Sequence, residues 1–500
     1  MTVANRPNPA LAADGLNMSS TVTLPTWLFV ILALLALWAA LDRLLVPGVR
    51  WYFRRKVNRV IREIGARLSV EVPQFKLTRR EVLIDRLSYD PKVQAAVERE
   101  CREQGLPRDV VAQRVDRYAR EIVPAFNAYL YFRIGYWLAK RFARLLYRVR
   151  LGYADTAALA AVNPKSSIVF VMNHRSNMDY VLVAFLAAER VALSYAVGEW
   201  ARVWPLQQLI RSMGAYFVRR NSGDALYRTV LARYVQMAVE AGVPQAVYPE
   251  GGLTADGRLR PPRLGLLDYM LKAFDPAGER DLVFIPVGIN YDRVLEDRTL
   301  LRKLDAAAPR RGIAYALARS TGFAARQLWL MLTGRWYRFG YACVNFGRPI
   351  SMREFVARSG VDLRALDDAS RHREVERLAA EIMEAIARIV PVLPVSVVAT
   401  IVLGDHGAGL SELELKSAAY DLVRRLESAG AHIYVPRGDL DYAFGVGLRM
   451  LVLRRVVTEE NGLYRAHPDD LALLRYYANA IAPLLESVAP SRTGAVGRAA

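Results

Sequence analysis

Cysteine is nearly absent from this chain of 500 residues, which contains only Cys101 and Cys343. Two cysteines provide neither a disulfide framework nor the clustered ligands of a zinc site. A protein that does not depend on disulfides is typical of a reducing compartment. We therefore expect a body that folds in the cytosol and binds no metal.

Several common catalytic and binding motifs are also missing. The sequence has no P-loop, and it has no G-x-S-x-G nucleophile elbow, because the nearest run, residues 318–322, lacks the first glycine. It also lacks a compact Lys/Arg stripe or a recognisable nucleic-acid-reading module. These absences argue against P-loop chemistry and a serine-elbow hydrolase, and we expect no nucleic-acid partner.

Acidic residues are outnumbered, since 69 Lys and Arg stand against 49 Asp and Glu, a formal net charge of +20. Such a charge attracts polyanions, here anionic lipid headgroups or acidic and phosphorylated substrates. The chain is long enough for two or three domains. Its hydrophobic fraction of 53% is high for a soluble protein and low for a polytopic membrane protein. A soluble body with a short membrane attachment fits both values.

One long apolar run lies near the N-terminus. Residues 24–41 carry no charge, and as a helix they rise about 27 Å, close to the thickness of a bilayer's hydrocarbon core. Residues 1–23 carry only Arg6 and Asp14, whereas basic side chains follow the run at positions 43, 50, 54, 55, 56 and 59. The positive-inside rule then places the rest of the chain in the cytoplasm.

We therefore predict a single-pass protein of the inner (plasma) membrane, with a tail at 1–23 and a transmembrane helix at 24–46. Two alternatives remain open. A cleaved signal peptide needs its basic residues before the apolar run, which is not the order here. A buried core helix is the other alternative.

The pattern along the rest of the chain predicts three further regions and a flexible tail at 491–500. Residues 47–150 read as a helical accessory region, in which aromatic residues and arginines alternate from 124 to 150. This last stretch suits either an interfacial membrane contact or an amphipathic helix packed on the body. Residues 361–490 read as a mainly helical C-terminal domain.

Residues 151–360 alternate between strand and helix patterns. Short apolar runs predict strands at 167–172, 191–197, 216–218, 246–248, 283–289 and 341–346, with a helix at 224–241 between them. Apolar strands separated by helices indicate an α/β layer fold. Strands that are continuously apolar are typical of a sheet buried on both faces.

The strongest chemical signal is His174, followed five residues later by Asp179, directly after the first predicted strand. The end of such a strand is where α/β sheets present reactive groups. Ser176 is placed to cap the next helix, with Asp179 in its first turn. A histidine held by a carboxylate can act as a general base. The alternative is a solvated histidine beside a helix-capping aspartate.

Two basic or glycine-containing segments follow other predicted strands. Arg219 and Arg220 come at the end of the strand at 216–218, and arginine pairs bidentately with phosphate, although an ordinary surface pair is the simpler interpretation. Glu250 and Gly251 follow the strand at 246–248. Glycine lets a ligand approach the backbone closely and Glu250 could bind a substrate hydroxyl, but a plain surface turn is the alternative.

Further along, arginines 258, 260 and 263 add positive charge around two prolines, and Pro286 lies within the strand at 283–289. Each of these features is weak alone. In this order, however, the four motifs resemble the four blocks of the glycerolipid acyltransferases, and the chain is most similar to the bacterial membrane-bound glycerol-3-phosphate acyltransferases. Residues 344–351 and segments at 463–465 and 476–479 extend the resemblance, which covers roughly residues 90–490.

The resemblance implies an acyltransferase core with a mixed sheet flanked by helices. It also implies roles: His174 and Asp179 as the catalytic pair, and Arg219 and Arg220 as phosphate ligands. Glu250 and Gly251 would bind the acceptor, and Pro286 would shape the acyl site. The expected donor is acyl-CoA or acyl carrier protein, the acceptor is glycerol 3-phosphate and the product is lysophosphatidate. No metal or cofactor is implied.

One segment departs from the family pattern. The family usually continues after the glycines with Arg-Ser-Arg, whereas this chain has Leu253-Thr254-Ala255. Arg258 or Arg260 is the candidate to replace the missing phosphate ligands. The departure keeps two alternatives open: an acyltransferase for another acceptor, such as dihydroxyacetone phosphate or lysophosphatidate, and an inactive, basic membrane scaffold.

Overall fold

The computed structural model describes residues 73–187, 193–198, 206–219, 222–272, 274–302, 304, 329, 338–405 and 407–488. The predicted membrane span, both predicted tails and Arg220 lie outside these residues. Within the described ranges, no helix is long and apolar enough to cross a membrane. All described residues belong to one compact unit, Ile64–Ala500. The predicted domain boundaries inside it stay predictions.

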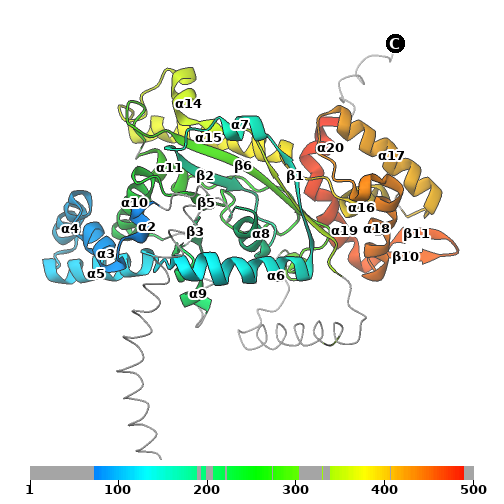
Figure 1. Cartoon of the computed structure of the whole chain (residues 1–500), viewed down its shortest axis with the longest axis horizontal. Coiled ribbons are helices and arrows are strands. Elements are labelled where there is room, and N and C mark those ends of the chain that lie inside the picture. The colour runs from blue at the N-terminus through cyan, green and yellow to red at the C-terminus, as the bar shows by residue number, and fades with distance from the viewer. Residues whose placement is uncertain are drawn as a thin grey trace, which may run out of the picture. The chain divides into compact units, whose positions relative to one another are not determined.

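A large mixed sheet forms the centre of this unit (Figure 1). Its strand order is β1-β7-β6-β2-β5-β3-β4, and the short β8 pairs with β6. Strands β2 to β6 are mutually parallel along this order, whereas β7 runs antiparallel to β6. The strands are β1 (Arg148–Ala154), β2 (Ser167–Met172), β3 (Ser194–Val197), β4 (Ala215–Phe217), β5 (Gln245–Val247), β6 (Leu282–Tyr291), β7 (Tyr341–Phe346) and β8 (Ile350–Ser351). The expected mixed sheet is confirmed.

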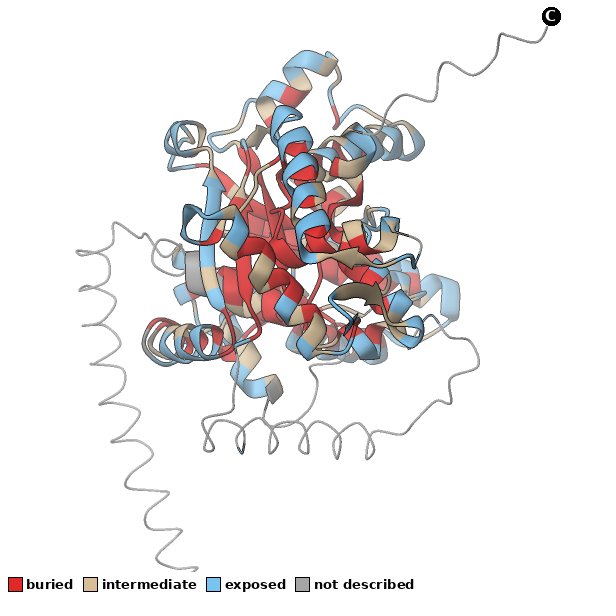
Figure 2. Cartoon of the chain, turned by 90° about the vertical axis from the view of Figure 1, so that its right-hand side faces the viewer, coloured by how far each residue is buried: buried red, intermediate tan, exposed pale blue. Residues whose placement is uncertain are grey.

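The sheet is buried because helices cover it. All ten residues of β6 are buried, as are all residues of β4 and β5, and Figure 2 shows the buried residues gathered at the centre. The flanking helices are α7 (Thr156–Ala160), α8 (Met178–Ala187), α9 (Leu206–Ser212), α10 (Ala225–Glu240), α11 (Gly265–Leu271), α12 (Asp297–Leu301), α14 (Met352–Ser359) and α15 (Asp368–Ile389). The continuous apolar runs of the sequence therefore correspond to strands that are largely buried.

One strand contradicts the sequence prediction. Residues 148–150 were expected to end a long helix, but they begin β1, which pairs in parallel with β7 at the edge of the sheet. Its residues are mostly exposed. Among the first four, Arg148, Arg150 and Leu151 are exposed and only Val149 is partly buried. An exposed edge strand needs no apolar run, so the pattern used to find the other strands is missing here.

Four short helices precede the sheet: α2 (Gln74–Leu77), α3 (Arg80–Ser88), α4 (Pro91–Gln104) and α5 (Arg108–Ile122). Asp90 caps α4 by accepting a hydrogen bond from the Lys92 backbone, Pro91 occupies its first position and Gly105 ends it with φ of 65°. The buried valines of α4 and α5 share one apolar core with α10. These accessory helices are thus packed directly on the α/β layer.

The aromatic segment before β1 forms a π-helical turn, η1 (Leu130–Gly135), and then α6 (Tyr136–Leu146). Small residues, Ala139 and Ala143, face the body and are buried, whereas Trp137 and Phe142 are exposed. The helix is therefore packed on the body, as one alternative expected. Its outer face carries large apolar side chains together with arginines.

The C-terminal region is mainly helical, as predicted. It contains α16 (Pro394–Gly404), α17 (Glu412–Ser428), α18 (Leu440–Leu453), α19 (Leu471–Ala478) and α20 (Ala482–Val488). A small sheet in the order β10-β11-β9 was not predicted; its strands are β9 (Leu410–Ser411), β10 (Val457–Glu460) and β11 (Leu463–Ala466). Asn461 and Gly462 connect β10 to β11 with φ of 53° and 75°, the turn that an Asn-Gly pair favours in hairpins.

Candidate active site

The loop between β2 and α8 carries the predicted catalytic pair. Asn173 fixes its start, because the Asn173 side chain donates to the carbonyl of Ile289 (2.9 Å) and accepts from its N–H (2.8 Å), which ties the loop to β6. His174 Nδ1 lies 2.9 Å from Asp179 Oδ2. Their side chains are 4% and 0% exposed. The structure therefore brings the two predicted residues together in a buried loop.

Asp179 is held by more than the imidazole. Its Oδ2 also accepts from the backbone N–H groups of Arg175 (2.8 Å) and Ser176 (3.0 Å), and its Oδ1 accepts from the hydroxyl of Tyr291. A carboxylate is only an acceptor, so the hydrogen bond to Asp179 assigns the imidazole proton to Nδ1. Nε2 is then the ring nitrogen that can accept a proton from a substrate.

Two tyrosines hold the imidazole plane. The ring of Tyr248 stacks on His174 with centroids 4.0 Å apart, and Tyr180 meets it edge-on at 5.5 Å. Together with the Asp179 hydrogen bond, these contacts leave the ring little freedom to rotate. The result is the preorganised orientation that a general base needs.

Glu250 lies behind this loop. Its Oε1 accepts from the N–H of His174 (2.8 Å) and its Oε2 from the N–H of Arg260 (2.9 Å), and the residue is 1% exposed. Burial raises the pKa of Glu250 to about 7, although these two hydrogen bonds lower it. The sequence suggested a substrate hydroxyl as its partner. In the structure, both oxygens bind backbone N–H groups and position the loop.

The predicted phosphate ligands are only partly described. Arg219 forms a bidentate pair with Glu121 (2.9 and 2.6 Å), and its guanidinium lies 5.0 and 4.8 Å from the rings of Tyr118 and Tyr227. The hydrogen bond to Glu121 raises the pKa of Arg219. Arg219 is thus held in place by the accessory helix α5, and a bound phosphate would share it with Glu121.

A cavity of 420 Å³ opens beside His174 and contains Arg219 and Gly251 in its wall. Two further arginines, Arg228 and Arg263, line it as well. Gly251 has φ of +66°, and a Cβ atom there would lie 2.5 Å from Cδ of Arg263. Glycine is therefore required both by the backbone conformation and by the arginine packed against it.

The rest of this cavity is mostly apolar. Its walls come from the ends of β3, β4 and β5 and from α10 and α11; the apolar residues are Ala196, Val197, Val218, Leu231, Val247, Leu266 and Leu267. An apolar cavity with cations and a histidine at one side can hold a hydrocarbon chain next to an anionic group. Arg228 had no motif in the sequence, since it lies on α10, one turn after the Asp224 cap.

Arg258, Arg260 and Pro286, which the sequence analysis named, are among the residues that do not line the cavity. Arg258 pairs instead with Glu486 on the surface (3.3 Å), and the Arg260 side chain donates to the carbonyl of Leu253 (3.4 Å). Pro286 is buried in the middle of β6, where its carbonyl accepts from Gly347. In this arrangement Arg263, rather than Arg258 or Arg260, is the arginine of the loop that faces the cavity.

The segment that departs from the family pattern has a structural use. The N–H of Thr254 donates to the carbonyl of His174 (3.0 Å). Its hydroxyl donates to the carbonyl of Arg258 (2.7 Å) and accepts from the N–H of Gly257 (3.1 Å). Thr254 is 2% exposed. Thr254 therefore cross-links residues 254–258 to one another and ties them to the loop that carries His174.

The C-terminal region supports both loops through α19. The guanidinium of Arg175 lies 5.1 Å from the ring of Tyr476, and the Tyr476 hydroxyl donates to the Arg175 carbonyl (3.4 Å). The Asn479 side chain donates to the carbonyl of Asp256 (2.9 Å). At Gly257, a Cβ atom would lie only 2.0 Å from the Tyr476 carbonyl oxygen. Sequence reasoning assigned no function to this region.

A second support follows β6. Glu296 accepts from the Ser176 hydroxyl (2.7 Å) and from the N–H of Asn177 (3.2 Å), and burial raises the pKa of Glu296. Its neighbour Asp297 pairs with Arg454, which follows α18 directly (2.6 Å). The catalytic loop is thus connected through adjacent carboxylates to the C-terminal helices. No local motif marks either residue.

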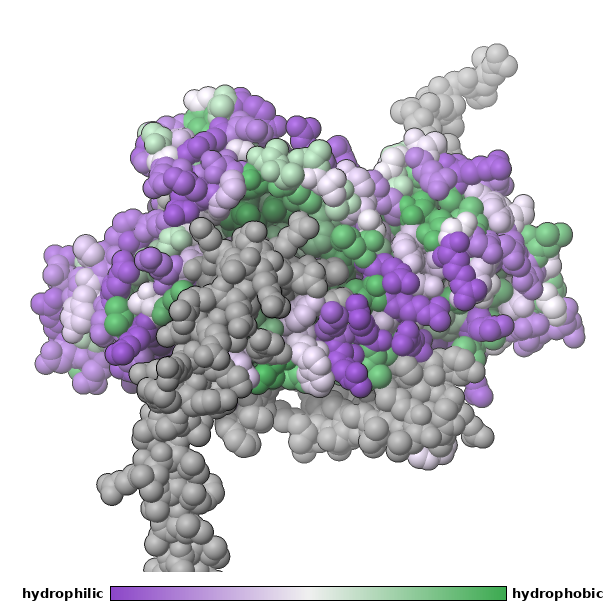
Figure 3. Space-filling view, viewed as in Figure 1, coloured by the Kyte–Doolittle hydropathy of each residue, from purple (hydrophilic) through white to green (hydrophobic). Residues whose placement is uncertain are grey.

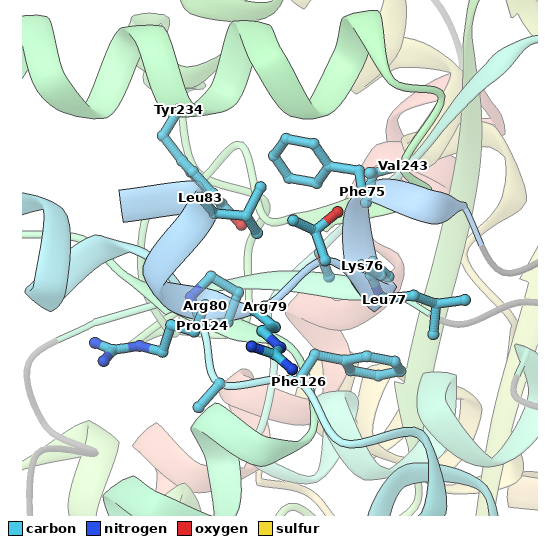
Figure 4. A pocket seen from close by; sticks show the side chains of 13 residues that line it. Phe75, Lys76, Leu77, Arg79, Arg80, Leu83, Pro124, Phe126, Tyr234 and Val243 are labelled. Carbon is cyan, nitrogen blue, oxygen red and sulfur yellow. The ribbon is translucent and has the colours of Figure 1, made fainter. Parts of the chain in front are cut away.

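A separate cavity of 260 Å³ lies among the accessory helices (Figure 4). Phe75 and Lys76 of α2 line it, and so does Phe126. Nζ of Lys76 lies 4.7 Å from the ring of Phe126, and burial lowers the pKa of Lys76 well below its usual value. This cavity contains none of the predicted site residues.

Two family models match the chain. An acyltransferase model matches residues 156–290, and a model of the glycerol-3-phosphate acyltransferase C-terminal region matches residues 328–489. The two models support the resemblance to the glycerolipid acyltransferases seen in the sequence, which is thus confirmed.

Its curated relatives include glycerol-3-phosphate acyltransferases. That of Pseudomonas paraeruginosa is 29% identical over 371 residues, covering 72% of this chain and 43% of the relative. That of Pseudomonas putida is 27% identical over 397 residues, covering 77% and 46%. The chain thus spans less than half the length of these relatives. Among solved structures, the 1-acyl-sn-glycerophosphate (LPA) acyltransferase PlsC from Thermotoga maritima matches 51% of this chain and 78% of its own, at 16% identity and a TM-score of 0.29.

Proposed function

We propose that this protein is a glycerol-3-phosphate 1-O-acyltransferase. It transfers a fatty acyl group from acyl-CoA or acyl carrier protein to glycerol 3-phosphate and releases lysophosphatidate. The observation that carries the proposal is the buried His174–Asp179 pair (2.9 Å) at the wall of a cavity that also contains three arginines. The names of the curated relatives support the same acceptor.

In the proposed reaction, Nε2 of His174 removes the proton from the 1-hydroxyl of the acceptor. The hydroxyl oxygen attacks the thioester carbonyl carbon, an O–C bond forms and the C–S bond then breaks. The imidazolium returns its proton to the departing thiolate, so atoms and charges balance. Asp179 stabilises the imidazolium while it exists. The reaction as written uses no metal and no cofactor beyond the acyl donor.

The phosphate of the acceptor would bind among Arg219, Arg228 and Arg263, which line the cavity together with His174. Arginine forks match phosphate oxygens. The Arg263 position offers a replacement for the arginines that the family carries at positions 253 and 255. Because this set differs from the family pattern, dihydroxyacetone phosphate is the second candidate acceptor.

Attachment to the cytoplasmic face of the inner membrane belongs to the same proposal. It is supported by the uncharged run at residues 24–41, by the net charge of +20 and by the exposed apolar face of α6. Trp137 and Phe142 on this face lie beside the exposed Arg141 and Arg144, a combination that suits the interface of an anionic bilayer.

The test is acyl transfer from a radiolabelled acyl-thioester in membranes that contain the wild type or His174→Ala. Glycerol 3-phosphate and dihydroxyacetone phosphate are supplied in parallel. Product that forms only with glycerol 3-phosphate, and disappears in the variant, is the expected result. Equal background in both proteins with every acceptor would leave the inactive scaffold as the explanation.

A further inference from the structure

The catalytic cavity continues into a long open groove. The groove has a volume of 770 Å³ and runs along α4, α10 and α11 to the start of α15. Arg228, Gly265 and Tyr269 line both the cavity and the groove. The two spaces are therefore adjacent at these residues, and a ligand that extended past them would reach from the groove toward His174.

Cations line the groove, and they fall into two groups. Arg233 pairs with Asp90 (2.7 Å) and Glu240 (2.8 Å), and Lys272 pairs with Asp268 (3.1 Å), so these two are occupied. Three other cations in its wall have exposed side chains and form no ion pair with any described carboxylate: Lys92, Arg99 and Arg228.

Two of these cations lie on α4 and the third lies on α10. Lys92 and Arg99 stand seven residues apart on α4, which is two helical turns, so both lie on the same side of that helix. Arg228 lies across the groove on α10, at its junction with the cavity. In Figure 3 hydrophilic side chains gather over α3, α4 and α5, whereas apolar ones gather over the middle of the sheet.

We propose that this groove binds the nucleotide end of a coenzyme A thioester. Lys92 and Arg99 would contact the 3′-phosphate and diphosphate, and the pantetheine arm would pass Gly265 into the cavity, where its thioester reaches His174. This inference rests on the proposed function and adds the location of the donor. It assigns coenzyme A to the groove because its nucleotide carries the phosphates that the exposed Lys92 and Arg99 can bind.

Gly265 lies where the groove and the cavity adjoin, and a substitution there tests whether the donor passes between them. No heavy atom lies within 4 Å of the position that its Cβ would occupy, and its φ is not in the left-handed region. A larger side chain there would not collide with the protein, but it would project into the open space at the junction. Gly445 of α18, far along the chain, has the same open surroundings and serves as the matched control.

The first experiment compares two donors, acyl-CoA and S-acyl-pantetheine, which lacks the nucleotide and its phosphates. We expect Lys92→Ala/Arg99→Ala to raise KM for acyl-CoA about tenfold, as two exposed charge contacts allow, and to leave KM for S-acyl-pantetheine unchanged. Gly265→Leu should reduce kcat/KM for both donors, whereas Gly445→Leu should change neither. An unchanged KM for acyl-CoA in the double variant overturns the proposal, and so does an equal rise of KM for S-acyl-pantetheine.

The second experiment does not depend on turnover. Binding of adenosine 3′,5′-bisphosphate to the full chain is measured by calorimetry in the wild type, in His174→Ala and in Lys92→Ala/Arg99→Ala. We expect binding that survives in His174→Ala and weakens about tenfold in the double variant. Equal affinity in all three proteins, or no binding, overturns the groove assignment. If no donor and acceptor pair gives product, the proposed function fails, and the binding result still decides the groove.

Discussion

Glu250 gives the sharpest test of how the catalytic loop is held. The change Glu250→Gln replaces one of two carboxylate oxygens by an NH₂ group, while the N–H groups of His174 and Arg260 stay where they are. One buried backbone donor then lacks an acceptor, which costs about 1–3 kcal/mol. If that cost appears as displacement of His174, kcat falls about fivefold to a hundredfold.

The assay measures kcat and KM for glycerol 3-phosphate. Because Glu250 contacts the loop and no cavity wall, we expect a lower kcat with a nearly unchanged KM. Glu486→Gln is the matched control, since Glu486 pairs with Arg258 on the surface. The reasoning is refuted by a raised KM with an unchanged kcat, which would show that Glu250 binds the acceptor hydroxyl, as the sequence alone suggested.

The pH dependence adds a second criterion. Since the pKa of Glu250 is raised to about 7, its carboxylate is ionised above pH 7 and protonated below it, where it resembles the amide of glutamine. The ratio of wild-type to Glu250→Gln kcat should therefore be largest near pH 8 and approach one near pH 5.

Three further predictions concern the fold and the membrane. Gly257→Ala places a Cβ 2.0 Å from the Tyr476 carbonyl oxygen and should destabilise the protein by more than about 2 kcal/mol, seen as a lower midpoint in thermal or urea unfolding, with Gly223→Ala unchanged. Burial raises the pKa of Asp292 to about 7. Its folded-state pKa lies above its unfolded value, so its stabilisation is complete below pH 4 and is lost as pH rises toward 7, by about 1.4 kcal/mol per unit; Asp292→Asn should lack this slope in urea titrations. Finally, Trp137→Ala/Phe142→Ala should weaken binding to anionic vesicles about tenfold, and unchanged co-sedimentation would remove α6 from the membrane contact.

Much of the core could be read from local patterns. The strands β2, β4, β5, β6 and β7 lie within two residues of their predicted positions, because strands buried on both faces need continuous apolar runs. Helix α4 begins and ends where Asp90, Pro91 and Gly105 indicate. The Asn461-Gly462 hairpin also carries a local signal, because an Asn-Gly pair favours this turn.

The predicted catalytic pair could also be found from a local pattern. His174 and Asp179 are five residues apart, so one loop and the first turn of one helix are enough to bring them to 2.9 Å. The order of the motifs along the chain also indicated the family. Neither inference needed any contact between distant segments.

The surroundings of the pair are different, because distant segments build them. Glu250 accepts hydrogen bonds from two distant backbone N–H groups, Arg228 lines the cavity from α10, and Tyr476 reaches Arg175 across 301 positions of sequence. Burial and hydrogen-bond partners depend on how the layers pack. The periodicity of apolar residues along the chain does not show which layers pack against each other. The sequence by itself thus determined the His174–Asp179 pair and its local geometry, whereas packing between remote helices selected the residues that hold the pair and the cations beside it.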